Sequence, residues 1–161
     1  MADRSTPRPT SLSFLLLVYI ALLIGGIALF YIIVYAAEAF FGLSFPESNS
    51  MGLVIILVAA NSTGTIWFNR EQVVPSSGRK WALAALMCIA TTAVQGAMFF
   101  LLLFGLDEVG QFKREFAGDD RMLIVAALLT VVFLQFLLLR ASLWFGIRTA
   151  AKRHAALAAK A

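Results

Sequence analysis

The middle of one long apolar run contains the stretch Ala59-Ala60-Asn61-Ser62-Thr63-Gly64-Thr65. On a helix, Asn61, Gly64 and Thr65 share one face, because they are separated by three or four positions. Small residues on such a face let a second helix backbone approach closely, and polar groups inside a bilayer need partners. We therefore expect other membrane-spanning helices to meet this segment.

The composition places the whole chain in a membrane. Hydrophobic residues make up 61% of its 161 residues and charged residues 14%, against about 45–50% and about 25% in soluble domains. The apolar residues form four long runs, and about 18 apolar residues suffice to cross a bilayer core. The sequence predicts an all-α integral membrane protein, a four-helix transmembrane bundle with spans at about 12–37, 51–68, 81–105 and 122–147.

The charges outside the spans predict the topology. Four spans leave the two polar tails, residues 1–11 and 148–161, on the same side of the membrane. Positive residues accumulate on the cytoplasmic side of membrane proteins. One side would hold Arg4, Arg8, Arg70, Arg79, Lys80, Arg148, Lys152, Arg153 and Lys160, and the other only Lys113, Arg114 and Arg121. Both termini are therefore expected to be cytoplasmic.

Three tryptophans and one arginine are expected at the inner membrane boundary. Trp67, Trp81 and Trp144 all fall at the cytoplasmic ends of their predicted spans, where the amphipathic indole ring is favoured. Arg140 lies inside the fourth apolar run, close to that end. We expect its side chain to extend to the headgroups and to stack on Trp144.

Further polar side chains lie near the centres of the third and fourth spans. Thr91 and Gln95 share a helical face of the third span, and Gln135 is central in the fourth. Together with Asn61, Gly64 and Thr65 they are interpreted as helix-packing residues that form hydrogen bonds between helices. The alternative is that they line a permeation pathway.

Several other features have a simple structural interpretation. Gly25-Gly26 favours close approach of another helix rather than a transport hinge. Glu38 is expected at the outer headgroup level, and Cys88 as a small buried hydrophobic residue. Residues 106–121 separate the last two spans, and their pattern fits either an interfacial helix or a partner-docking face.

Catalytic chemistry finds little support in the residues. The chain has one cysteine and one histidine, His154 in the tail, so no catalytic residues, metal site or cofactor site are predicted. Nucleic acid is not an expected partner, since no basic face is interleaved with aromatic residues. The expected partners are the lipid bilayer, anionic lipid at the C-terminal tail, and either a second copy or a larger membrane protein.

One resemblance extends along most of the chain. A long first span and a small-residue second span precede Trp67-Phe68 and the hairpin Pro75-Ser76-Ser77-Gly78-Arg79-Lys80-Trp81-Ala82-Leu83. This order resembles a family of short four-span bacterial inner-membrane proteins without an assigned function. Members of that family carry an acid where this chain has Arg79 and a base where it has Val73. The resemblance implies a bacterial inner membrane and four helices, but no activity.

The leading functional interpretation is a non-enzymatic inner-membrane protein that acts as an accessory subunit or a self-associating structural component. The alternative is an oligomeric small-solute or ion transporter or channel, lined by Asn61, Thr65, Thr91, Gln95 and Gln135. A third interpretation, a lipid-modifying enzyme at the inner interface, would have to use Arg79, Lys80 or Arg140.

Overall fold

The structure is a computed structural model that describes residues 9–42, 49–105 and 121–159. Four α-helices in these ranges are each long and apolar enough to cross a membrane. They are α1 (Leu12–Phe41), α2 (Asn49–Glu71), α3 (Ser77–Gly105) and α5 (Arg121–Ala158). The prediction of an all-α, four-span integral membrane protein is confirmed, and the last helix continues through most of the basic tail.

Local signals in the sequence account for where these helices begin and end. The Ser11 hydroxyl accepts a hydrogen bond from the backbone N–H of Phe14 at 3.2 Å, which caps the start of α1. Gly42 ends that helix in the left-handed conformation, at φ 63°, and its N–H donates to the carbonyls of Ala37 and Glu38. After α2, Gln72 adopts a positive φ of 51°. Pro75 then precedes α3, where a proline does not interrupt a helix.

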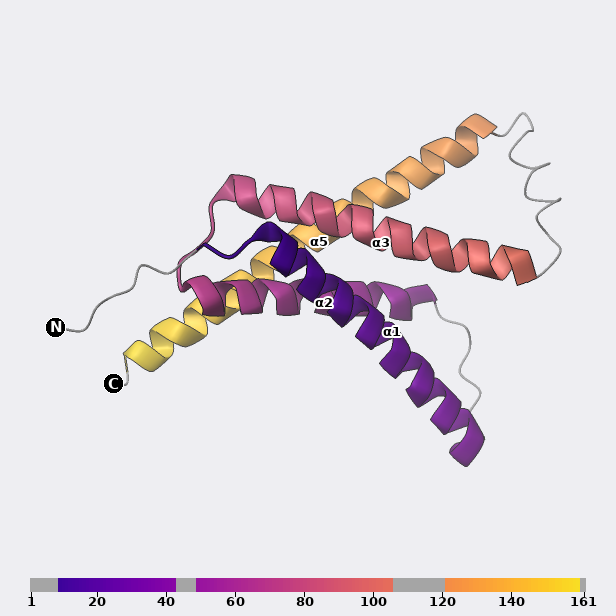
Figure 1. The fold of residues 1–161 in the computed structure, drawn as a ribbon, viewed down its shortest axis with the longest axis horizontal. Helices are drawn as coiled ribbons and strands as arrows, with labels where there is room; N and C mark the ends of the chain where they lie inside the picture. The colour runs from indigo at the N-terminus through magenta and orange to yellow at the C-terminus, as the bar shows by residue number, and fades with distance from the viewer. Residues whose placement is uncertain (1–8, 43–48, 106–120, 160–161) are drawn as a thin grey trace.

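The four helices converge at one end of the bundle and diverge at the other (Figure 1). We call the first end the closed half; it contains the start of α1, the end of α2, the start of α3 and the end of α5. The opposite end is called the open half. Fully buried side chains gather in and next to the closed half: Leu15, Tyr19, Leu23, Trp67, Leu83, Met87, Leu139 and Leu143.

Apolar side chains of the open half lie at the surface. On α1 these include Ile32, Tyr35 and Phe40, and on α5 Met122 and Leu123. In a soluble protein such surfaces would promote aggregation. Here the apolar helices imply contact with the lipid bilayer.

The most extensive helix contact joins α2 to α5, which are far apart in the sequence. The two helices run in the same general direction (Figure 1). The Ser142 hydroxyl of α5 donates to the backbone carbonyl of Leu57 at 2.7 Å. One helical turn further along α5, the Thr65 hydroxyl donates to the carbonyl of Gly146 at 3.4 Å. Side chain to backbone bonds of this kind require two closely spaced helices.

Two glycines, one on each helix, make this close approach possible. A Cβ atom at Gly64 would lie 2.5 Å from the carbonyl oxygen of Leu143, and one at Gly146 would lie 2.6 Å from the side-chain oxygen of Asn61. Real Cβ atoms do not come this close, and the obstructing groups are mainly backbone. We call this contact the glycine crossing. The α2 ridge Ala60-x-x-x-Gly64 therefore meets a second small-residue ridge on α5, Ser142-x-x-x-Gly146-x-x-x-Ala150.

The glycine crossing predicts how single methyl groups affect stability. Gly64→Ala and Gly146→Ala should each lower the free energy of unfolding by about 1–3 kcal/mol, the usual cost of overpacking. Gly96→Ala is the matched control, because a Cβ at Gly96 meets nothing within 4 Å. That variant should be neutral or stabilised by up to about 1 kcal/mol through helix propensity. Unfolding titrations in mixed detergent micelles measure all three, and equal effects would contradict the crossing.

Candidate functional site

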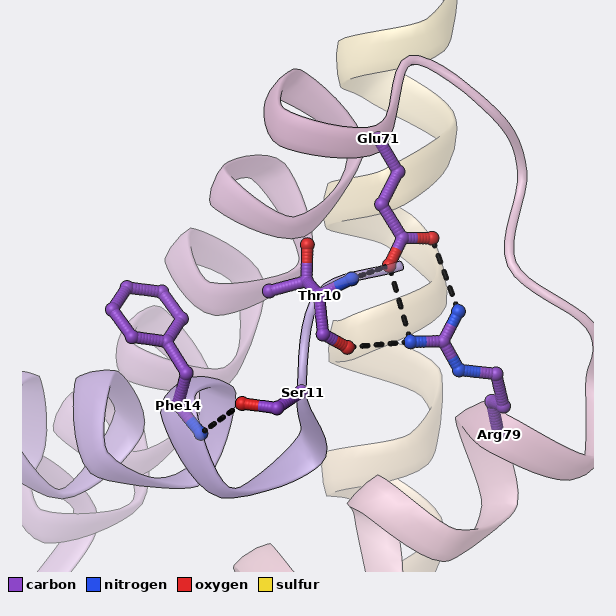
Figure 2. Close-up of polar contacts among 5 residues, drawn as sticks. All are labelled: Thr10, Ser11, Phe14, Glu71 and Arg79. Carbon is purple, nitrogen blue, oxygen red and sulfur yellow. Dashed lines mark hydrogen bonds and ion pairs between the residues drawn. The ribbon is translucent and has the colours of Figure 1, made fainter. Parts of the chain in front are cut away.

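The most polar cluster of the described residues lies at the closed end of the bundle, where three segments meet (Figure 2). Arg79 on α3 donates two hydrogen bonds to the Glu71 carboxylate at the end of α2, both at 3.1 Å. The same guanidinium donates to the backbone carbonyl of Thr10 at 2.6 Å. In return, the Thr10 N–H donates to Glu71 at 2.7 Å. We call this arrangement the Thr10–Glu71–Arg79 clamp.

The hairpin between α2 and α3 brings the two charged residues together. Glu71 is the last residue of α2, and Arg79 lies in the first turn of α3. The intervening segment turns at Gln72 and buries Pro75. An arginine fork matches a carboxylate in two parallel bonds, a geometry that lysine does not supply. The clamp therefore fixes the segment before α1 against the hairpin.

Two cation–π contacts lie at the clamp and beside it. The Arg79 guanidinium lies 5.2 Å from the ring centre of Trp67, which is fully buried. Arg70, next to the clamp on α2, lies over the ring of Phe14 at 4.1 Å. Cation–π contacts of this kind stabilise by about 0.5–2 kcal/mol, depending on how far water is excluded. The contact of Arg70 with Phe14 joins α2 to α1, and the contact of Arg79 with Trp67 joins α3 to α2 and orients the guanidinium.

The clamp was not predicted from the sequence. In the sequence, Glu71 has three basic residues nearby, Arg70, Arg79 and Lys80, and the sequence does not indicate which of them pairs with its carboxylate. Trp67, which is expected at the inner membrane boundary, lies at the closed half and is fully buried inside the protein.

The remaining residues expected at the inner boundary lie at the closed half, with different contacts. Trp81 and Trp144 are exposed to 45% and 42%. The expected stacking of Arg140 on Trp144 is wrong. The Arg140 guanidinium lies over the ring of Trp81, 4.8 Å from the ring centre. The Arg148 guanidinium lies over the ring of Trp144, 4.9 Å from the ring centre. One turn along α5 separates Arg140 from Trp144, but the neighbouring α3 offers it a nearer ring.

Three of the central polar residues make contacts between or within helices. The Thr91 hydroxyl on α3 lies 2.6 Å from the hydroxyl of Tyr19 on α1, in a hydrogen bond that is fully buried. Thr65 reaches the Gly146 carbonyl of α5. The backbone of Asn61 faces Gly146 at the glycine crossing, while its buried Oδ1 has no hydrogen-bond partner among the described residues.

The two glutamines do not join the helices as expected. Gln95 is exposed. Gln135 is 8% exposed, but its Nε2 lacks a hydrogen-bond partner within the described part of the chain. The register explains the difference, because α5 crosses α2 near Gly146, about three turns beyond Gln135. Asn61 and Gln135 are therefore not at one level, although Gln95 and Gln135 line one cavity.

Cavities lie between the helices in and beside the open half. One cavity, of about 240 Å³, lies between α1, α2 and α3, and its lining residues include Leu23, Phe30, Ile56 and Gln95. A second, of about 330 Å³, lies between α2, α3 and α5, and both glutamines line it. A third, of about 250 Å³, follows the outer groove between α1 and α2. All three are predominantly apolar and open to the surroundings of the bundle.

Other residues named from the sequence are also placed by the structure. A Cβ at Gly26 would lie 2.8 Å from the side chain of Ile55, so α1 approaches α2 there, whereas Gly25 meets nothing within 4 Å. Glu38 is exposed near the end of α1. Cys88 is buried, and its thiol donates to the carbonyl of Val132 on α5 at 3.7 Å. Residues 106–121, expected to form either an interfacial helix or a partner-docking face, lie outside the described residues, except for Arg121.

The described residues contain no group of three metal-ligating side chains. Comparisons of the chain with protein-family models, with curated proteins and with solved structures found no match. The class of protein that the fold defines is a four-span integral membrane protein whose closed half is fixed by the glycine crossing and the clamp.

The clamp predicts a measurable coupling between its two charges. Arg79→Gln should lower the free energy of unfolding by about 1–3 kcal/mol, because the buried Glu71 carboxylate loses its charged donor. Adding Glu71→Gln should recover part of that loss, with an interaction energy of about 0.5–3 kcal/mol in a double-mutant cycle.

The control for this cycle is Lys152→Gln, which removes an exposed charge from α5. It should stay within about 0.5 kcal/mol of the unmodified chain. Additive effects of the two clamp substitutions would show that the ion pair does not stabilise the fold.

Proposed function

We propose that the protein is a non-enzymatic component of a bacterial inner membrane that associates, through its open half, with a larger membrane protein or a second copy. The observation that carries the proposal is the unequal packing of the two halves. The closed half is held by the glycine crossing, the clamp and buried large side chains. The open half leaves apolar cavities beside diverging helices.

Lipid chains can enter such cavities, whereas the side chains of a second helix would fill them in one defined arrangement. Helix association in a membrane depends on close packing of matching surfaces rather than on exclusion of water. The groove of α1 and α2 contains Gly26, Ala59 and Ser62, which are small, beside Phe30 and Ile33, which are large. Alternation of small and large side chains favours an interdigitating helical partner.

The distribution of the polar residues supports an accessory role over a solute pathway. Thr91 is bonded towards α1, whereas Thr65 and Asn61 face α5. Thr91 and Gln95 line the cavity between α1, α2 and α3, and Gln95 and Gln135 line the cavity between α2, α3 and α5, but Asn61 and Thr65 line neither. A pathway along all five residues would require the helices to separate where they are packed most closely. Solute flux into proteoliposomes that is abolished by Gln95→Leu would support the pathway instead.

Of the three cationic residues that a lipid-modifying enzyme would need, Arg79 and Arg140 make contacts within the protein, whereas Lys80 lines a cavity at the closed end. Arg79 donates its hydrogen bonds within the clamp, and Arg140 packs on Trp81. These contacts support a structural role for both. The bacterial membrane itself is inferred from the resemblance of the Pro75–Trp81 hairpin to short bacterial four-span proteins.

The distribution of basic residues between the two ends of the bundle indicates the orientation in the membrane. At the closed end the described residues include Arg70, Arg79, Lys80, Arg148, Lys152 and Arg153, whereas Arg121 lies at the open end. The positive-inside rule therefore favours a cytoplasmic closed end, with both termini inside.

Reporter fusions test this orientation. Alkaline phosphatase fused after Ala161 should be inactive in bacterial cells, and green fluorescent protein at the same position should fluoresce. Fusions at Gly42, between the first two spans, serve as the control and should show the reverse. An active phosphatase at the C-terminus would overturn the proposed orientation.

Photo-cross-linking tests the association. A benzoylphenylalanine in place of Leu134, which lines the cavity between α2, α3 and α5, should yield protein adducts in native membranes. The same probe in place of Phe145, an exposed residue of the closed half on the same helix, should yield lipid adducts only. Mass spectrometry then identifies the partner as a second copy or another protein. Lipid adducts alone at both positions would contradict the proposal.

A further inference from the structure

A small basic cavity lies at the closed end, apart from the clamp and from the cavities of the open half. Its volume is about 150 Å³. It is bounded by the segment before α3, the first turn of α3 and one face of α5. Its walls are Val74, Lys80, Trp144, Ile147, Arg148 and Ala151.

Two cations from different elements line this cavity, and none of its lining residues is acidic. Lys80 comes from the first turn of α3, where the helix dipole is positive. Arg148 comes from α5, and its guanidinium lies 4.9 Å from the ring centre of Trp144. This contact holds the guanidinium at the cavity wall. The nearest acid of the hairpin, Glu71, is already bonded to Arg79.

The rest of the wall is apolar. Val74, Ile147 and Ala151 supply aliphatic surface, and Trp144 is partly exposed, as an indole at a membrane boundary would be. Basic pockets between transmembrane helices recognise anionic headgroups by this combination of cations and apolar wall. The cavity is smaller than a site that encloses a whole ligand, so it suits one headgroup whose acyl chains remain in the bilayer.

We propose that this cavity binds the phosphate group of an anionic phospholipid, with Lys80 and Arg148 as its two cationic ligands. Trp144 positions Arg148, and the aliphatic wall contacts the glycerol and upper acyl region. The site is distinct from general attraction of the basic tail to a negative surface, because it depends on two residues that converge from separate helices. It also does not depend on the partner proposed for the open half.

Native mass spectrometry of the full chain, released from detergent micelles that contain dioleoyl phosphatidylglycerol or dioleoyl phosphatidylcholine, tests the site. The protein should retain one phosphatidylglycerol in preference to phosphatidylcholine. The double variant Lys80→Gln/Arg148→Gln should bind phosphatidylglycerol roughly 25-fold more weakly, about fivefold for each cation. Circular dichroism confirms that the variant is folded before the comparison.

The matched control is Lys152→Gln/Arg153→Gln, which removes the same charge from exposed positions of α5. It should retain phosphatidylglycerol within about twofold of the unmodified chain. An equal loss in the control, or equal retention of the two lipids, would overturn the proposal. Inorganic phosphate at millimolar concentration should not displace the lipid. If it displaces the lipid fully, the site binds free phosphate and the assignment to a phospholipid is wrong.

Discussion

The close approach of α2 to α5 is the constraint on which the rest of the bundle depends. Gly64 and Gly146 have no side chains, so α2 and α5 can approach each other closely. At this short separation, hydroxyl groups reach the backbone carbonyls of the opposite helix, as the Ser142 hydroxyl reaches the Leu57 carbonyl. In a bilayer, where apolar burial gives little advantage over contact with lipid, such packing and hydrogen bonding stabilise helix association. The remaining helices are arranged around this pair.

The clamp extends that arrangement to the first helix. Two whole spans, α1 and α2, separate Thr10 from Arg79 in the sequence, but the Glu71 carboxylate bonds to both. Together with the buried hydrogen bond between Tyr19 and Thr91, it fixes the closed half of α1 against α2 and α3. No comparable polar contact is found among the described residues of the open half of α1. This difference in packing between the closed half and the open half is the basis of the proposed association through the open half.

Much of the fold follows from the sequence, because membrane spans are defined by length and hydrophobicity. The four runs became four helices, and Gly64, singled out from its small neighbours, lies at the closest helix contact. Its counterpart Gly146 was missed, although Ser142, Gly146 and Ala150 repeat at intervals of four. They fall where the apolar run gives way to the basic tail, so the span appeared to end before the pattern was complete.

Contacts between side chains were less predictable. The level at which α5 crosses α2 decides whether Asn61 and Gln135 meet, and hydropathy does not determine that level. The pairing of Glu71 with Arg79 depended on the turn at Gln72, and the ring nearest to Arg140 belonged to another helix. Such choices depend on distances of a few ångströms between elements that the sequence places only approximately.

The most direct test of the account is a disulfide cross-link across the glycine crossing in native membranes. In a Cys88→Ala background, Leu57→Cys paired with Ser142→Cys should oxidise readily to an intramolecular disulfide, because Ser142 contacts the Leu57 backbone. Leu57→Cys paired with Phe145→Cys, on the exposed face of α5, should not. Efficient cross-linking of the second pair, with none in the first, would show that α2 and α5 do not pack through the small-residue faces.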